Sequence, residues 1–568
     1  MNAPIGEKVR NLNEHADVII VGAGLAGLVA ADELISKGKR VVIVDQENSQ
    51  AFGGQAFWSF GGLFLVNSAQ QRRMGIRDSI DLAWDDWQNS AQWDRQDSEL
   101  AEDHWAMQWG RSFVEFAGGE MASWIQEKGI SLTPMVGWAE RGALTQSGHG
   151  NSVPRFHVAW GTGTGVVGPF AERVRQAAQE GKLKLLFRHR VDELIVEGGE
   201  CRGVSGAVLA EDQAERGRPT NREVIDDFSL RASAVVVATG GIGANHELVR
   251  RWWPERLGTA PQQMLTGVPA SVDGRMLDIV AKAGGRLVNR DRMWHYTEGI
   301  RNHDPLWPGH AIRILPGPSA LWLDALGRRL PNPALPGFDT LGTLRTLRTD
   351  PDLAEYDHSW FIATKSIVAK EFALSGSEQN PDITDRKPLR VVGSRLTSRM
   401  PEPLQAFLDH GEDFVQAPDI LALVKKMNAL TPQAPLDPQG VLQIVQARDR
   451  AMANPFGKDA QVMAIHNARR YRGDRLARVA TPHRLLSRRH GPLIAVRLRT
   501  LTRKSLGGIQ TDLSGQVRDA QGVAIPGLFA AGEAAGFGGG GVHGYNALEG
   551  TFLGGCLFTG LSVGRALS

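Results

Sequence analysis

The first clear pattern in the chain is a pair of short apolar runs separated by a segment with helical spacing. Residues 17–21 are almost wholly apolar, and residues 40–44 form a second run of the same kind. Between them, residues 25–37 carry apolar side chains at intervals typical of a buried helix. Strands that alternate with a helix in this way predict a βαβ unit, in which the two strands lie parallel.

Similar patterns return at both ends of the chain but not in its middle. Residues 191–210 and 222–231 alternate like antiparallel strands, and 234–238 is another apolar run. From about 246 to 489, Pro, Arg and Trp become frequent and strand patterns are sparse. From about 490 the strand and glycine patterns resume, ending in a glycine-rich helix at 546–566. We therefore expect one domain made of residues 1–245 plus 490–568, with 246–489 inserted as a cap or substrate domain.

Composition narrows the class of protein. The 568 residues are 42% hydrophobic and 22% charged, with a formal net charge of only +2 and no basic stretch, which argues against a nucleic-acid partner. The only cysteines, Cys201 and Cys556, form no CxxC pair, and nothing indicates a metal site. No apolar run approaches the ~20 residues of a membrane span, and the N-terminus lacks a signal-peptide core, so we expect a cytoplasmic protein without a membrane span.

The βαβ unit contains a nucleotide-binding motif. Gly22, Gly24 and Gly27 form a GxGxxG sequence that follows the first strand and opens the helix, and Asp45 closes the second strand. The glycines permit a tight turn and a close approach to a pyrophosphate, and the acid binds ribose hydroxyls. The contacts expected from this unit are Gly22, Gly24, Leu25, Ala26, Gly27, Asp45 and Gln46. Because NAD and FAD use the same unit, it does not choose between them.

Three later segments distinguish FAD from NAD. They are a glycine- and aromatic-rich stretch at 53–62, the sequence ATGG at 238–241, and an apolar strand ending in Gly-Glu at 527–533. Together with GxGxxG, their order and spacing resemble the fumarate reductase/succinate dehydrogenase flavoprotein superfamily, including its 3-ketosteroid Δ1-dehydrogenase branch. The resemblance covers roughly 16–245 and 490–566. It implies an α/β fold, with a Rossmann-like FAD-binding domain of the glutathione reductase type and an inserted α+β cap.

The resemblance also implies how FAD is held. The 53–62 segment would run beside the isoalloxazine and pyrophosphate, ATGG would touch the AMP half, and the acid of Gly-Glu would bind the ribityl chain. The N-terminus of the last helix would face the flavin pyrimidine and favour the reduced anion. The residues implied are Gly54, Gln55, Ser59, Gly61, Gly62, Val191, Ala238, Thr239, Gly240, Gly532, Glu533, Asn546, Ala547 and Leu548. Members that attach FAD covalently use a His in the segment matching 53–62, which has none here, so we expect non-covalent FAD. For Glu533, a solvated loop acid is the alternative.

The family reaction couples hydride transfer between a carbon and flavin N5 to a proton transfer at the neighbouring carbon. It needs a proton acceptor or donor near that carbon and a cation or hydrogen-bond donor on the carbonyl. Lys504 stands where soluble fumarate reductases carry a His, and Ala547 stands where they carry an Arg, which disfavours a dicarboxylate substrate. The catalytic tyrosine of the steroid branch is also missing, because the matching stretch reads Gly-Pro-Leu-Ile at 491–494.

Candidate catalytic residues remain on local grounds. His543 and Tyr545 flank a glycine in the loop expected to pass the flavin, and Arg503 and Lys504 lie one strand earlier. Tyr296 lies in the cap, where the steroid branch also supplies a tyrosine. For each of them, a structural or surface role is the alternative. Eight of the 15 Trp lie between 58 and 138, either as hydrophobic filling or as a wall for a flat apolar substrate.

The sequence therefore favours an FAD-dependent dehydrogenase acting on a CH–CH group next to a carbonyl. The alternatives are a flavin-dependent alkene reductase, a flavin-holding isomerase or hydratase without net redox change, and a nucleotide-binding protein without turnover. The expected partners are a small apolar carbonyl substrate and an unidentified electron acceptor. No CxxCH haem-attachment sequence is present, and the oligomeric state is open.

Overall fold

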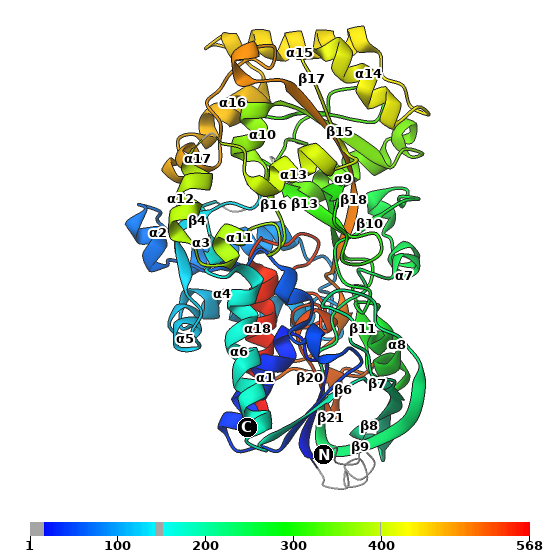
Figure 1. Ribbon diagram of the computed structural model, residues 1–568. Helices are drawn as coiled ribbons and strands as arrows, with labels where there is room; N and C mark the ends of the chain where they lie inside the picture. Colours follow the sequence, from blue (N-terminus) through cyan, green and yellow to red (C-terminus); the bar gives the residue numbers. More distant parts are fainter. Residues whose placement is uncertain (1–15, 143–151, 398) are drawn as a thin grey trace, which may run out of the picture.

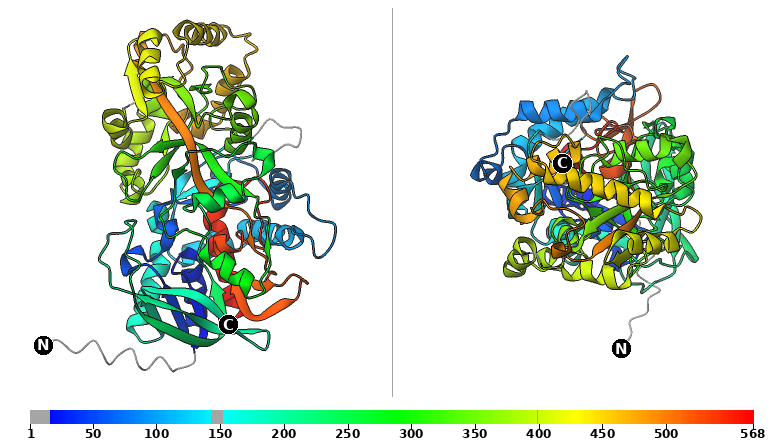
Figure 2. Two further views of the ribbon diagram at one scale, coloured as in Figure 1. Left: turned by 90° about the vertical axis from the view of Figure 1, so that its right-hand side faces the viewer. Right: turned by 90° about the horizontal axis from the view of Figure 1, so that it is seen from above.

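The computed structural model describes residues 16–142, 152–397 and 399–568. The expectation that the N-terminus lacks a signal peptide concerns mainly residues 1–15, which lie outside the described residues. The described part is built on two eight-stranded sheets (Figures 1 and 2). In Figure 1 the sheet containing β9 and β21 lies at the bottom, and the sheet containing β15, β17 and β18 lies at the top. We call them the lower and the upper sheet.

The lower sheet has the strand order β20-β21-β9-β1-β2-β6, parallel apart from the β20–β21 pair. β1 lies in its centre, with Ile20 opposite both Ile43 and Val236. A parallel strand covered on both faces needs apolar side chains at nearly every position, which explains the unbroken apolar runs. The bounds are β1 Ala16–Val21, β2 Val41–Asp45, β6 Leu183–Phe187, β9 Val224–Val237, β20 Gln516–Arg518 and β21 Ala524–Ala530.

Two additions complete this half of the molecule. β7 (His189–Glu197) and β8 (Glu200–Leu209) form an antiparallel ribbon with β9, as the alternating pattern predicted. α1 (Leu25–Ser36) packs against α6 (Thr162–Gln179) and α18 (Thr551–Ala566), and Figure 1 shows the three helices side by side. The predicted C-terminal helix thus begins only at Thr551, and residues 546–550 form an irregular segment before it.

The upper sheet has the order β14-β15-β18-β12-β13-β16, with β10 and β17 also paired to β18. The middle of the chain therefore contains more strands than the sequence pattern predicted. In β12 every residue except Arg301 is buried, so no alternation of polar and apolar positions marks it. The bounds are β10 Leu265–Thr266, β12 Met293–Arg301, β13 Ala311–Leu315, β14 Leu321–Leu323, β15 His358–Thr364, β16 Ala373–Leu374, β17 Phe414–Ala417 and β18 Leu493–Ser505.

β18 connects the two halves. It begins in the upper sheet beside β15 and β17, and Figure 2 shows it as a long orange strand that runs down toward the lower half. Its last residues pair with β12, with Lys504 opposite Trp294 and Leu501 opposite Tyr296. This pairing brings Arg503 and Lys504 next to Tyr296, although about 200 positions separate them in the sequence.

The remaining elements cover these sheets. Among the described residues, no helix combines the length and the apolar character needed to cross a membrane. The helices are α2 Ala69–Arg73, α3 Ile80–Ala91, α4 His104–Gly118, α5 Met121–Glu127, α7 His246–Arg251, α8 Arg275–Lys282, α9 Thr340–Thr349, α10 Lys365–Glu371, α11 Pro381–Thr384, α12 Pro388–Leu396, α13 Glu402–His410, α14 Ile420–Leu430, α15 Pro438–Ala453, α16 Ala460–Ala468 and α17 Arg472–Ala477. Two small sheets join β3 Gly62–Phe64, β5 Phe156–Ala159 and β4 Leu132–Gly137, and β11 Leu287–Val288 with β19 Gly508–Ile509.

Candidate active site

A cavity with about 1060 Å³ of empty space lies at the carboxyl ends of the parallel strands, and we call it the first cavity. This is the edge at which open α/β sheets bind dinucleotides. The expected cofactor residues that line it are Gly22, Gly24, Leu25, Ala26, Asp45, Gln46, Gly54, Gln55, Val191, Ala238, Thr239, Gly240, Gly532 and Glu533. The structure thus brings together four sequence segments that are far apart in the chain.

The glycines of the first cavity fit a pyrophosphate. Gly22 has φ +103°, and a Cβ placed there would lie 2.6 Å from the carbonyl oxygen of Ala238. Gly27 does not line the cavity; a Cβ on it would lie 2.3 Å from the carbonyl oxygen of Gly22, so this glycine lets α1 pack closely against the turn. A side chain at Gly22 would disrupt the tight turn, as expected for a site where backbone N–H groups meet phosphate.

Asp45 fits a ribose at the end of β2. Its two carboxylate oxygens accept hydrogen bonds from the backbone N–H groups of Ala23 and Glu47, both at 2.8 Å. Burial raises the pKa of Asp45 to about 6, against the opposing effect of these two donors. Each oxygen keeps a further lone pair for a hydroxyl donor. The residues present therefore fit an FAD molecule.

A second cavity, with about 850 Å³ of empty space, lies next to the first. Both cavities share Gln55, Ala56, Glu533 and Cys556 on their walls. Apolar side chains form most of the second wall, chiefly Phe60, Phe156, Leu315, Leu501, Phe537, Phe552 and Leu553. No Trp of the described residues is on it, so tryptophan does not form a substrate wall here. The expected residues that line it are Gln55, Ser59, Gly61, Gly62, Tyr296, Arg503, Lys504 and Glu533.

Lys504 and Glu533 meet where the two cavities join. Glu533 is 3% exposed and accepts hydrogen bonds from Gln55 Nε2 at 2.6 Å and from the backbone of Ser505 at 2.9 Å. Lys504 Nζ lies 3.2 Å from Gln55 Oε1 and 3.6 Å from Glu533 Oε2, and burial lowers the pKa of Lys504. Glu533 is therefore a buried, paired acid, and the alternative of a solvated loop acid is wrong.

Tyr296 and Arg503 lie on the wall of the second cavity itself. Tyr296 is 6% exposed, and among the described residues no hydrogen bond reaches its hydroxyl. Burial raises the pKa of Tyr296, so the phenol stays protonated and acts as a hydrogen-bond donor. Arg503 donates to the carbonyl oxygen of Gly267. Ser59 Oγ is buried without a protein partner in the described structure and is also on this wall.

A cluster of charged residues, of which Arg313 and Glu549 line this wall, was not predicted. Arg313 Nη1 lies 2.7 Å from Glu549 Oε1, Nη2 pairs with Glu140, and Nε lies 3.5 Å from Glu298 Oε2. Its guanidinium carbon lies 3.7 Å from the ring centre of Tyr296. We call these three glutamates and Arg313 the Arg313 cluster. The sequence contains a sign of it, because Arg313 interrupts the otherwise apolar stretch that becomes β13.

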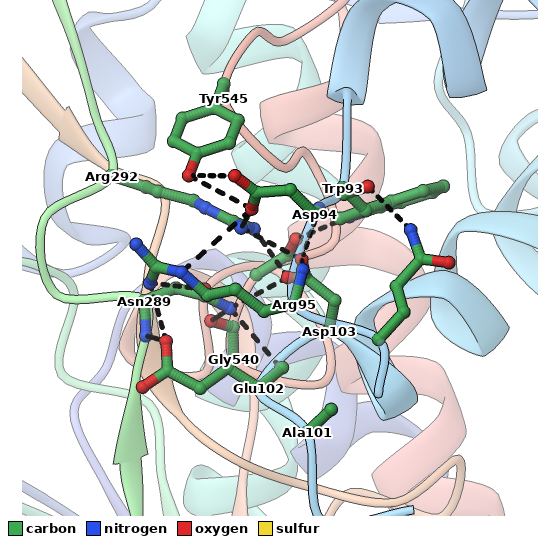
Figure 3. A network of polar contacts seen from close by, with 12 residues as sticks. Trp93, Asp94, Arg95, Ala101, Glu102, Asp103, Asn289, Arg292, Gly540 and Tyr545 are labelled. Atoms are coloured by element: carbon green, nitrogen blue, oxygen red, sulfur yellow. Dashed lines mark hydrogen bonds and ion pairs between the residues drawn. The ribbon is translucent and has the colours of Figure 1, made fainter. Parts of the chain in front are cut away.

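His543 and Tyr545 lie outside both cavities. His543 Nε2 is 2.8 Å from Thr551 Oγ1, its ring stacks on Trp87, and burial lowers its pKa to about 3. The Tyr545 hydroxyl donates to Asp94 at 2.9 Å. Figure 3 shows Tyr545 in a polar network that joins it through Asp94 to Arg292.

The segment after Tyr545 is also placed apart from the two cavities. Asn546 donates through Nδ2 to the carbonyl oxygen of Ser90 at 3.0 Å, and Ala547 and Leu548 are buried. None of the three is on the wall of either cavity, so their contact with the flavin stays a prediction. Among the residues that the structure describes, no group of three or more His, Cys, Asp or Glu is arranged to hold a metal ion.

Comparisons with known proteins agree with this geometry. A family model described as an FAD binding domain matches residues 17–553. A KsdD-like steroid dehydrogenase of Mycobacterium tuberculosis is 56% identical over 550 residues, covering 97% of this chain and 95% of that protein. Its counterpart in Mycolicibacterium smegmatis is 57% identical over 538 residues, covering 95% of this chain and 96% of that protein.

Solved structures share the fold. The crystal structure of 3-ketosteroid delta1-dehydrogenase from Sterolibacterium denitrificans has a TM-score of 0.64 and 18% sequence identity, and the match covers 97% of this chain and 99% of that one. The predicted fold class, a Rossmann-like α/β domain with an inserted α+β cap, is thereby confirmed.

Proposed function

Since the chain belongs to the FAD binding domain family and is an FAD-dependent dehydrogenase, we propose that it desaturates a 3-ketosteroid-like substrate in the CH–CH group next to the carbonyl. The observation that carries this proposal is the second cavity, a largely apolar space that shares wall residues with the dinucleotide cavity. Identity above 50% with two KsdD-like steroid dehydrogenases, over nearly the whole chain, supports a substrate of this class.

The residues of the two cavities have different roles, cofactor binding in the first and substrate binding in the second. Those of the first cavity bind FAD, and bound FAD supplies the hydride acceptor. In the second cavity, the Phe and Leu side chains exclude water and hold the flat rings of the substrate. The neutral phenol of Tyr296 donates a hydrogen bond to the substrate carbonyl, which stabilises the negative charge that develops on that oxygen, and Arg503 adds positive charge nearby.

The finer expectations belong to the same proposal. FAD is held non-covalently, because the 53–62 segment offers no His, and acid precipitation should release all the flavin into the supernatant. A pellet that stays yellow would contradict this.

The electron acceptor is a small diffusible molecule. A cytoplasmic location is supported by the two cysteines, which are both free thiols.

Anaerobic titration of the holoenzyme tests the function. A steroid with a saturated ring next to its 3-keto group should bleach the flavin absorbance, and the 3-hydroxy analogue, which lacks the carbonyl, should not. Reoxidation of dithionite-reduced enzyme by the unsaturated ketone, without bleaching by the saturated one, would instead identify an alkene reductase. Product formed without any change of flavin colour would identify an isomerase or hydratase.

A further inference from the structure

One positive charge in the Arg313 cluster faces three carboxyl groups. Burial raises the pKa of Glu140 well above its usual range and also raises that of Glu298, which favours the protonated form of both. Glu298 and Glu140 lie behind the guanidinium and are 1% and 6% exposed. Glu549 lines the second cavity together with Arg313, and its Oε1 lies 2.7 Å from Arg313 Nη1.

Glu549 has an oxygen available to the cavity. Its Oε1 accepts a hydrogen bond from Arg313 Nη1 at 2.7 Å, and within the described residues no donor bonds to Oε2. The same guanidinium lies over the ring of Tyr296. Arg313 therefore holds a hydrogen-bond donor and a proton acceptor on the same wall, which are the two groups that removal of a proton beside a carbonyl requires.

The other polar groups of this wall are less suited to accept a proton. Glu533 is occupied by Gln55, Ser505 and Lys504 at the junction of the cavities. Burial raises the pKa of the Tyr296 phenol, which makes it a donor. Among the residues that line the second cavity, Glu549 is thus the only carboxylate with an unoccupied oxygen.

We propose that Glu549 is the catalytic residue that accepts the α proton of the ketone, and that Arg313 is the positioning residue that holds its carboxylate toward the substrate. This inference rests on the proposed function. The C–H bond at the α carbon breaks, its proton forms an O–H bond with Glu549 Oε2, and its electron pair becomes the second bond between the α and β carbons. The hydride from the β carbon leaves to the bound FAD, so the substrate is oxidised and the cofactor reduced. The proton then leaves Glu549 to water, and the diffusible acceptor reoxidises the cofactor.

The test uses the Glu549→Gln holoenzyme, with Glu378→Gln as matched control. Glu378 is also a largely buried carboxyl group near Arg503 but does not line the second cavity. The rate of anaerobic flavin bleaching by the saturated ketosteroid should fall about 10²–10⁴-fold in Glu549→Gln, the usual contribution of a general base. Steroid binding, measured by equilibrium dialysis, and the flavin content should be unchanged. Glu378→Gln should bleach at the wild-type rate.

A second readout does not depend on hydride transfer. Dithionite-reduced holoenzyme is incubated with the ketosteroid in D₂O, and mass spectrometry follows deuterium entering the α position. Exchange should be lost in Glu549→Gln and kept in Glu378→Gln. Arg313→Lys, which keeps the charge but not the fork geometry, should slow bleaching about 10- to 100-fold without weakening steroid binding, because the carboxylate is misplaced.

The outcomes separate this inference from the proposed function. Bleaching in Glu549→Gln at the wild-type rate overturns the role of Glu549 and leaves the function standing. Failure of the wild type to bleach with any ketosteroid overturns the function itself. If Glu549→Gln does not retain FAD, Glu549→Asp decides the question. It keeps a shorter carboxylate and should bleach about 10²-fold more slowly than wild type, and a wild-type rate would refute the proposal.

Discussion

Two tyrosines in this molecule lie against arginine side chains, in opposite settings. The ring of Tyr296 lies 3.7 Å from the guanidinium carbon of Arg313, and that of Tyr545 lies 4.2 Å from the guanidinium carbon of Arg292. Tyr296 lines the second cavity with a hydroxyl that no described residue bonds, whereas the Tyr545 hydroxyl is already bonded to Asp94, whose side chain is 59% exposed. The same pair of residue types is thus poised for a substrate in one place and occupied by the protein in the other.

The largest expected difference between the two settings concerns stability. Arg313→Met leaves Glu549 without its cationic partner, removes the pairing with Glu140 and Glu298, and should lower the free energy of unfolding by about 3–5 kcal/mol. Arg292→Met should cost less, because Asp103 keeps hydrogen bonds from Asn289 and from the backbone N–H groups of Asp94 and Arg95. Thermal unfolding of the two variants at the same pH measures this. Equal losses would mean that the two clusters do not differ as described.

The next effect concerns catalysis. Tyr296→Phe removes the donor to the substrate carbonyl and should lower the rate of flavin bleaching about 10²–10³-fold, the cost of losing one such donor. Because no described residue bonds to this hydroxyl, the melting temperature and the flavin absorbance should stay close to those of the wild type. Stopped-flow spectroscopy of the reductive half-reaction checks the rate. A rate within a few-fold of wild type would remove Tyr296 from the proposed site.

A smaller effect concerns pH. Arg313, Glu298, Glu549 and Asp339 face Glu140, and its pKa is raised above the ordinary value of 4.5 chiefly by burial. A carboxyl group with a raised folded pKa binds its proton more tightly when folded. Its contribution to stability is complete below about 4.5 and is lost as the pH rises through the folded pKa, by at most about 1.4 kcal/mol for each pH unit.

Glu140→Gln should remove the part of the pH-dependent loss of stability that Glu140 causes. Melting temperatures of wild type and variant, measured from mildly acidic to mildly alkaline pH, should therefore diverge, with the wild type falling more steeply as the pH rises. Curves that run parallel over the whole range would show that Glu140 does not bind a proton in the folded protein.

The smallest effect is expected at Tyr545. Tyr545→Phe removes a hydrogen bond to an exposed carboxylate and should cost about 1 kcal/mol of stability or less. The bleaching rate should change less than about 3-fold, because the residue lines neither cavity. Steady-state kinetics and thermal unfolding of the variant check both values. A loss of activity as large as that of Tyr296→Phe would show that the loop around Tyr545 reaches the flavin when FAD is bound.

The difference between the two tyrosines also shows which site residues could be predicted from the sequence. Both Tyr296 and Tyr545 were candidates because of the segments they belong to, and these segments alone did not separate the two residues. Glu549 and Arg313 were not candidates at all, since each is a single charge in a glycine-rich or apolar segment. Their proposed role depends on the contact between the two side chains, which are 236 positions apart in the chain.

The sequence by itself determined the dinucleotide cavity. Gly22, Gly24 and Asp45 act through backbone shape and one carboxylate at the end of a strand, and a local motif is sufficient to specify both. Only the tertiary structure decided which side chains share the second cavity. The pairing of β18 with β12 brings Arg503 and Lys504 to Tyr296. That wall is made of side chains from separate strands and loops, and contacts between distant segments depend on how the buried strands of the upper sheet pair, which leaves no periodic pattern in the chain.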